Sequence, residues 1–169
     1  MLLRIILFIT VFMGVIGSCK NQDSGTPTNE STTIPQAMDP IQKNIQDIEA
    51  YLKSNNLEAQ KTESNIYYVV TREGDGTHPT VADEVTVHYK GYFLNGEQFD
   101  SSYDRGEPTS FPLGRVVRGW QEGIPLFSKG GAGTLFLPSN LGYGSYPPPG
   151  IPPNSVLIFD VELMKINGN

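Results

Sequence analysis

The sequence predicts an α+β fold in which an antiparallel sheet wraps around one short helix, with a separate helix before it. Apolar residues follow helical spacing between residues 41 and 52, and they alternate with a period of two from residue 65 onward. The chain has 18 glycines and 13 prolines, most of them after residue 74, which indicates many turns. Only residues 119–127 suggest a second helix within the sheet region, which places the chain in the α+β class.

Residues 1–18 are predicted to be a lipoprotein signal peptide. Arg4 supplies a positive charge before an apolar run, and that run is shorter than the ~20 residues a membrane-spanning helix needs. The segment Ile16-Gly17-Ser18-Cys19 resembles the lipobox of bacterial lipoproteins, in which the cysteine is lipidated. Cys19 is also the only cysteine of the chain. An ordinary secretory signal and an uncleaved anchor are the alternatives.

Residues 19–37 are predicted to be a flexible tether. They are polar and poor in aromatic side chains, so they bury too little apolar surface to order themselves. Acyl chains on Cys19 would hold the protein at a membrane without spanning it. The tether would then let the folded part stand off from the surface.

Residues 38–64 are predicted to form a helical extension. Asp39 suits the N-cap and Pro40 the first helical position, and Asn55-Asn56 end the pattern. The apolar residues Ile41, Ile45, Ile48 and Leu52 form one stripe. We expect this stripe to pack on the protein's own domain, with a dimerisation helix as the alternative.

Residues 65–169 are predicted to form the folded domain. Strands are expected at 67–72, 85–93, from residue 98, at 133–138 and at 155–165. Val85, Val87 and Tyr89 fall on one face of the second of these strands. The Asn95-Gly96 turn predicts a hairpin between that strand and the next.

Several classes of function are disfavoured by composition. The net charge is −6 and the basic residues are scattered, so no nucleic-acid partner is expected. One cysteine and two histidines make a metal centre improbable, and no cofactor is expected. The chain has no nucleophile elbow, zinc-binding helix motif or phosphate loop. His88 falls on the strand face opposite Val85, which favours a surface or structural histidine over a general base.

Five sequence strings occur in a shared order within about one hundred residues. They are VTVHYKGYF (85–93), QFDSSYDRGEP (98–108), VVRGWQEGI (116–124), LGYG (141–144) and PGIPPNSVLIFDVELMKI (149–166). Over about residues 66–166 the chain thereby resembles the FKBP-type peptidyl-prolyl cis-trans isomerases. The resemblance implies an FKBP-like fold, a half-wrapped sheet with an apolar pocket whose floor is Trp120.

The resemblance also implies which residues form that pocket. Asp100, Tyr143, Phe99 and Trp120 are expected to be catalytic, and the substrate-binding residues are expected to be Tyr89, Arg105, Phe111, Val116, Val117, Ile151 and Phe159. Proline-containing polypeptides are the implied partners, and macrocycles of the FK506 kind are further implied ligands. The chain departs from the family pattern at Thr109, in the short stretch 114–116 and in the proline-rich loop 145–150.

The function expected from the sequence is prolyl isomerisation that assists the folding of exported proteins. A module that only binds proline-containing segments and a holdase chaperone without isomerase activity are the alternatives. The expected location is the bacterial cell envelope, where lipid would anchor the protein to the outer membrane or to the periplasmic face of the inner membrane. The order of signal, tether, helix and domain also resembles family lipoproteins of gliding Bacteroidetes, although no residue reports a role in motility.

Overall fold

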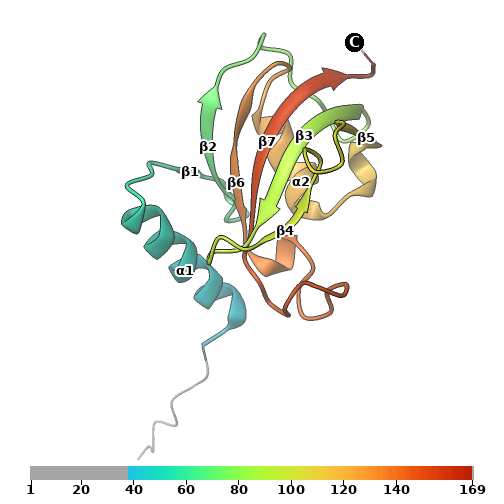
Figure 1. Ribbon diagram of the computed structural model, residues 1–169. Helices are drawn as coiled ribbons and strands as arrows, with labels where there is room; N and C mark the ends of the chain where they lie inside the picture. The colour runs from blue at the N-terminus through green and yellow to red at the C-terminus, as the bar shows by residue number, and fades with distance from the viewer. Residues whose placement is uncertain (1–37, 169) are drawn as a thin grey trace, which may run out of the picture. The chain divides into compact units, whose positions relative to one another are not determined.

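A computed structural model of the protein describes residues 38–168, so the predicted signal peptide (1–18) and the whole predicted tether (19–37), including Cys19, lie outside the described residues. The described part contains an antiparallel sheet and two α-helices (Figure 1). Its α-helices and strands are α1 (Pro40–Ser54), β1 (Gln60–Lys61), β2 (Tyr67–Arg72), β3 (Glu84–Tyr92), β4 (Gln98–Ser101), β5 (Thr109–Pro112), α2 (Arg118–Gly123), β6 (Ala132–Leu137) and β7 (Leu157–Ile166).

The seven strands form one sheet in the order β1-β2-β6-β7-β3-β4. Strand β5 also pairs with β3, so β4 and β5 share the same edge of β3 one after the other. The predicted hairpin between β3 and β4 is present: the Phe93 N–H donates to the Glu97 oxygen at 2.9 Å. Gly96 has a φ of +83° in that turn, a conformation that glycine adopts without strain.

The two α-helices lie on opposite faces of the sheet. Along β7, Phe159 and Val161 pack in the core cluster that contains Trp120 of α2. Ile158, between Leu157 and Phe159 in sequence, packs instead in the cluster that contains Ile48 of α1. Because neighbouring side chains on a strand point to opposite faces, the sheet carries one apolar layer on each side.

Helix α1 begins and packs as the sequence predicts. The Asp39 carboxylate accepts a hydrogen bond from the Ile41 N–H at 3.3 Å, and the helix ends at Ser54. Ile48 and Leu52 are buried against the outer face of the sheet, and Ile45 packs beside them. Three of the four residues of the predicted stripe therefore pack within the protein's own domain, while Ile41 is not part of this cluster.

A buried amide in α1 joins the helix to two loops. Asn44 is 5% exposed; its side-chain oxygen accepts from the Ser139 N–H at 2.9 Å, and its amide nitrogen donates to the Asn154 oxygen at 3.0 Å. Both ends of the segment 139–154 are thus held by one side chain of α1.

Replacing Asn44 with alanine is expected to lower the free energy of unfolding by about 2 kcal/mol, because two backbone groups lose their partners. The exposed neighbour Gln42→Ala on the same helix is the matched control, with a change within about 0.5 kcal/mol. Urea unfolding of both variants measures the difference. Equal stability of the two variants would show that water replaces the amide without cost.

The structure departs from the sequence prediction in three places. The predicted helix 119–127 is split into α2 and a 3-10 turn, Ile124–Leu126, since Pro125 in that turn has no N–H to donate. Strands β1 and β5 were not predicted: β1 has two residues, and β5 is bounded by Pro108 and ends in Pro112, which argues against a strand in the sequence. Within residues 38–168, no helix is long and apolar enough to cross a membrane.

Candidate functional site

The inner face of the sheet and α2 enclose an apolar pocket of about 340 Å³, called here the aromatic pocket. Its lining residues are Tyr89, Phe99, Asp100, Thr109, Phe111, Arg115, Val116, Val117, Trp120, Tyr143 and Phe159. They come from β3, β4, β5, β7, α2 and the loops between them. The pocket is therefore assembled from several strands, a helix and loops between residues 89 and 159 rather than by one loop.

The floor and walls of the pocket are aromatic rings in mutual contact. Trp120, which is 5% exposed, meets Tyr89 edge-on with ring centroids 5.0 Å apart and Phe159 edge-on at 5.1 Å. Phe111 packs on the other side of Trp120 at 5.3 Å, and Phe99 stands edge-on to Phe159 at 5.6 Å. Edge-to-face contacts of this kind are favourable, so the rings hold one another in place.

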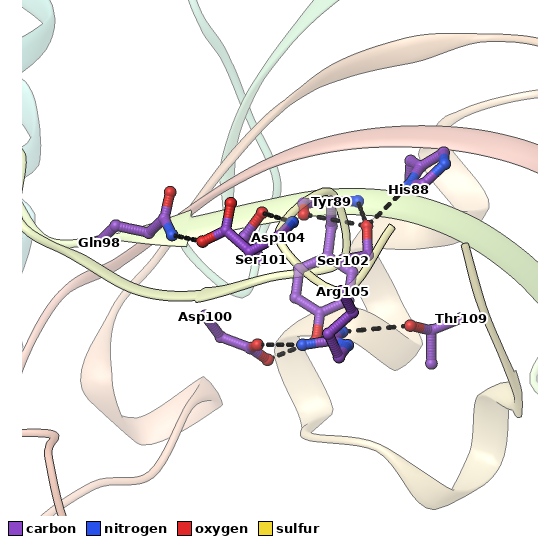
Figure 2. A network of polar contacts seen from close by, with 9 residues as sticks. All are labelled: His88, Tyr89, Gln98, Asp100, Ser101, Ser102, Asp104, Arg105 and Thr109. Atoms are coloured by element: carbon purple, nitrogen blue, oxygen red, sulfur yellow. Dashed lines mark hydrogen bonds and ion pairs between the residues drawn. The ribbon is translucent and has the colours of Figure 1, made fainter. Parts of the chain in front are cut away.

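A network of polar contacts joins Tyr89, Asp100, Arg105 and Thr109, and Tyr89 and Asp100 also line the pocket (Figure 2). The Tyr89 hydroxyl donates to one carboxylate oxygen of Asp100, and Arg105 donates to the other at 2.5 Å. Arg105 also donates to the Tyr89 hydroxyl at 2.9 Å and to the Thr109 hydroxyl at 3.2 Å. Asp100 is thus held by two donors, and it also lines the aromatic pocket.

These contacts set the protonation states at the pocket. Burial opposes ionisation of Asp100, but the hydrogen bonds from Tyr89 and Arg105 outweigh it and lower the pKa of Asp100 below its ordinary value. Burial and the bond to Asp100 raise the pKa of Tyr89, and burial and the Asp100 charge raise the pKa of Tyr143. At neutral pH the site therefore presents one carboxylate and two protonated tyrosines.

The stability of the protein should depend on pH through Asp100. Because the folded-state pKa is lowered, the ionised carboxylate stabilises the fold above its unfolded pKa, about 3.9, and this contribution is lost as the pH falls through the folded value. Asp100→Asn should therefore be less stable than the wild type at neutral pH, and the gap should narrow below about pH 4. Denaturant unfolding of both proteins from pH 7 to pH 3 measures this difference in the free energy of unfolding. A gap that does not change with pH would contradict the cause assigned here.

Ser102 fixes Tyr89 at the point where β3 changes partner from β4 to β5. Its hydroxyl accepts from the Tyr89 N–H at 2.8 Å, and its own N–H donates to the Tyr89 oxygen at 3.0 Å. The same hydroxyl contacts the His88 ring nitrogen at 2.8 Å, and the His88 ring stacks on Tyr103 at 4.4 Å. His88 is thus part of the support for β3 and does not line the pocket.

Several residues that line the pocket carry hydrogen-bond donors that no residue of 38–168 uses. Within 38–168, neither the Tyr143 hydroxyl nor the Val117 N–H makes a hydrogen bond. Tyr143 is 39% exposed, so its hydroxyl is accessible at the rim. The indole N–H of Trp120 also lacks a hydrogen-bond partner in the described part of the chain, but unlike the Tyr143 hydroxyl it is buried.

The structure brings nine of the eleven predicted pocket residues together in the lining. Arg105 is the first exception: it does not line the pocket, and its guanidinium donates hydrogen bonds to Asp100 and to the Tyr89 hydroxyl. Ile151 is the second: it lines an adjoining hollow of about 420 Å³ that shares Phe99 with the aromatic pocket. The structure adds Arg115 to the lining, together with Thr109, where the chain departs from the family pattern.

The described residues offer nothing that resembles a metal centre. Between residues 38 and 168, no group of three or more histidine, cysteine, aspartate or glutamate side chains is arranged to hold a metal ion. The groups that the described residues present at the pocket are its apolar walls, its hydrogen-bond donors and the carboxylate of Asp100.

A curved antiparallel sheet with a short helix and an aromatic pocket on its inner face defines an FKBP-like fold of the α+β class. The crystal structure of FkpA from Escherichia coli superposes with a TM-score of 0.68 at 41% identity, over 75% of this chain and 60% of that one. The crystal structure of AtFKBP13 gives a TM-score of 0.60 at 34% identity, over 64% and 98% of the respective chains. The predicted fold class is thereby confirmed.

Sequence comparisons identify the family. A sequence model of the FKBP-type peptidyl-prolyl cis-trans isomerases matches residues 75–164. The isomerase FkpA of Aeromonas hydrophila is 44% identical over 140 residues, which are 82% of this chain and 52% of that protein. FkpA of Escherichia coli (strain K12) is 44% identical over 118 residues, 70% of this chain and 43% of that protein.

The chain belongs to the family of FKBP-type peptidyl-prolyl cis-trans isomerases. This confirms the resemblance seen in the sequence and, at the level of the family, the expected enzyme class. The chain spans about half the length of the curated relatives it matches.

Proposed function

We propose that the chain catalyses cis/trans isomerisation of the peptide bond before proline in polypeptide clients. The observation that carries this function is the aromatic pocket, with unused donors at its rim and a charge-paired carboxylate in its wall. The family match over residues 75–164 supports the same reaction.

The reaction needs no proton transfer, which agrees with the groups in the pocket. Rotating the bond breaks amide resonance against a barrier of about 18–20 kcal/mol. The twisted amide carries less charge separation than the planar one, so an apolar pocket disfavours the planar form more than the twisted form. The pocket thereby binds the transition state better than the ground state. Each ~1.4 kcal/mol of this preference gives a factor of ten in rate.

The residues divide into three roles in this proposal. The rings of Trp120, Tyr89, Phe99 and Phe159 hold the proline ring, because they form the apolar floor and walls. The Tyr143 hydroxyl and the Val117 N–H donate to carbonyl oxygens of the client. These two groups are suited to it because both line the pocket and neither bonds elsewhere in residues 38–168.

Asp100 has the third role. Its carboxylate lines the pocket and faces the rotating carbonyl group of the client, while Arg105 and Tyr89 keep it ionised and in place. Arg105 is then a positioning residue that acts through Asp100. Phe111, Val116 and Val117 complete the apolar lining, and Ile151 extends the binding surface into the adjoining hollow.

A matched pair of tyrosine variants tests the proposal. The full-length protein is expected to accelerate exchange of a short X-Pro peptide, as measured by NMR exchange spectroscopy. Tyr143→Ala, which removes a pocket residue, should lower kcat/KM by about tenfold. Tyr146→Ala should leave it unchanged, because Tyr146 lies in the same loop, is 96% exposed and lines no part of the pocket.

Each other outcome of this experiment has a defined meaning. A folded wild-type protein that binds the peptide without accelerating exchange would replace the enzyme with a module that binds proline-containing segments. A protein that only suppresses aggregation of unfolded clients would favour the holdase alternative. Equal losses of kcat/KM in Tyr143→Ala and Tyr146→Ala would show that the pocket is not the site of the reaction. Displacement of the peptide by an FK506-like macrocycle would establish that further ligand.

We propose, in addition, that the protein is exported and anchored in the bacterial cell envelope by lipid on Cys19, where it assists the folding of exported proteins. The support is the apolar run before Cys19, the lipobox-like Ile16–Cys19 and the polar stretch 20–37. In cells fed with labelled palmitate, the wild-type protein should incorporate the label and the Cys19→Ala variant should not. Equal labelling of both would exclude this anchor.

A further inference from the structure

The aromatic pocket is the first of three adjoining hollows. The second, the side hollow of about 420 Å³, shares Phe99, Asp100 and Tyr143 with the aromatic pocket. The third, the helix hollow of about 330 Å³, shares Phe93 and Glu97 with the side hollow. The series starts beside α2, passes β4 and reaches α1, which Figure 1 shows on the other side of the sheet from α2.

Asn44 and Asp47 of α1 line the helix hollow. The N-terminal helix is therefore part of the same surface as the pocket. A client longer than the residues around its proline would lie along this surface, from the aromatic pocket toward α1.

Two of the four charged groups along the series are already neutralised. Asp100 pairs with Arg105 at 2.5 Å, and Asp47 pairs with Lys43 at 2.7 Å. These pairs contribute little net charge to a client.

The other two charged groups have no ionic partner in the described part of the chain. Arg115 lines the aromatic pocket and makes no ion pair with any of residues 38–168. Glu97 lines the side and helix hollows, and the only side-chain contact of its carboxylate there is the Asn95 amide at 3.5 Å. The series therefore carries one unpaired positive group, Arg115 in the aromatic pocket, and one unpaired negative group, Glu97 in the side and helix hollows.

We propose that the three hollows bind an extended client polypeptide in one direction set by charge, with an acidic client side chain at Arg115 and a basic one at Glu97. This inference rests on the proposed isomerase function, because it needs the client's proline in the aromatic pocket. The client class it names is X-Pro segments with opposite charges on the two flanks of the proline. Uncompensated charges are the groups from which a client of opposite charge gains most.

Two peptides of identical composition test the proposal. One carries lysine three residues before the proline and glutamate three residues after it, and the other carries them in the reverse order. The full-length wild type should isomerise one order about fivefold faster in kcat/KM at low ionic strength, as expected for two ion pairs made by exposed side chains. Added salt should reduce the preference.

Exchanging the two charges should invert the preference. The double variant Glu97→Lys, Arg115→Glu keeps the net charge and should favour the other peptide. The control Glu73→Lys, Lys165→Glu makes the same exchange at two exposed residues outside all three hollows and should keep the wild-type order.

The outcomes separate this inference from the function beneath it. Equal rates for both peptides, or an unchanged preference in the Glu97, Arg115 variant, would overturn charge-directed binding and leave the isomerase intact. A folded wild type that accelerates neither peptide would overturn the proposed function, and the inference with it.

Discussion

Replacing Phe159 with alanine is expected to lower the free energy of unfolding by about 3–5 kcal/mol and kcat/KM by about a hundredfold. Phe159 is 4% exposed, and its ring contacts Trp120, Tyr89 and Phe99. Its loss removes buried apolar surface and also the ring against which three pocket side chains are packed. Water and mobile neighbouring rings would then occupy the space in which, under the proposed mechanism, the planar amide is disfavoured.

Phe159→Leu is the matched variant, because leucine refills most of the space without an aromatic ring. It should cost less than about 1.5 kcal/mol in stability and keep a larger share of the activity. Urea unfolding followed by the fluorescence of Trp120, the only tryptophan, gives the stability of both variants. A folded Phe159→Ala protein with undiminished kcat/KM would show that the aromatic wall is not needed for catalysis.

Gly133→Ala should cost about 3 kcal/mol of stability, although it adds only one carbon. A Cβ at Gly133 would lie 2.2 Å from the Val69 oxygen and 2.4 Å from the Phe127 ring. The first is backbone of the paired strand β2 and the second is a ring 2% exposed, so neither neighbour can move aside easily. Strand β6 would have to shift, and with it the sheet that carries the pocket.

Gly114→Ala is the comparison for this variant. Its Cβ would meet a single atom, the Val81 oxygen, at 3.0 Å on an exposed stretch. A change of less than about 1 kcal/mol is expected there. Thermal and urea unfolding of both variants decide the matter, and equal stabilities would mean that β2 and β6 can separate at little cost.

The secondary structure could be predicted where one local signal decides it. Helix α1 follows from Asp39, Pro40 and an apolar stripe, and the strand faces follow from alternation that holds over many residues. Strand β5 could not be predicted, because the prolines at both of its ends argue against a strand, while its pairing with β3 is a tertiary contact. The split of the second helix depends on Pro125, whose effect the apolar pattern does not register.

The pocket residues could be predicted only through the family resemblance. Alternation places Val85, Val87 and Tyr89 on a buried face, but it does not distinguish an ordinary core from a pocket. The place of Arg105 behind Asp100 depends on the path of the chain between β4 and β5, which the motif does not specify. Arg115 falls in a stretch shorter than the family pattern, so no motif position assigned it a role.

The hydrogen bonds from Asn44 to residues 139 and 154 determine which part of the chain can be transferred to another protein as a folded unit. The family match starts at residue 75, yet the loop bearing Tyr143 is fastened at both ends by a helix that precedes that boundary. If residues 75–164 alone were fused to another protein, this loop would lose both hydrogen bonds to Asn44. The smallest unit of this chain that keeps the Tyr143 loop in place is accordingly expected to include α1 as well as residues 75–164.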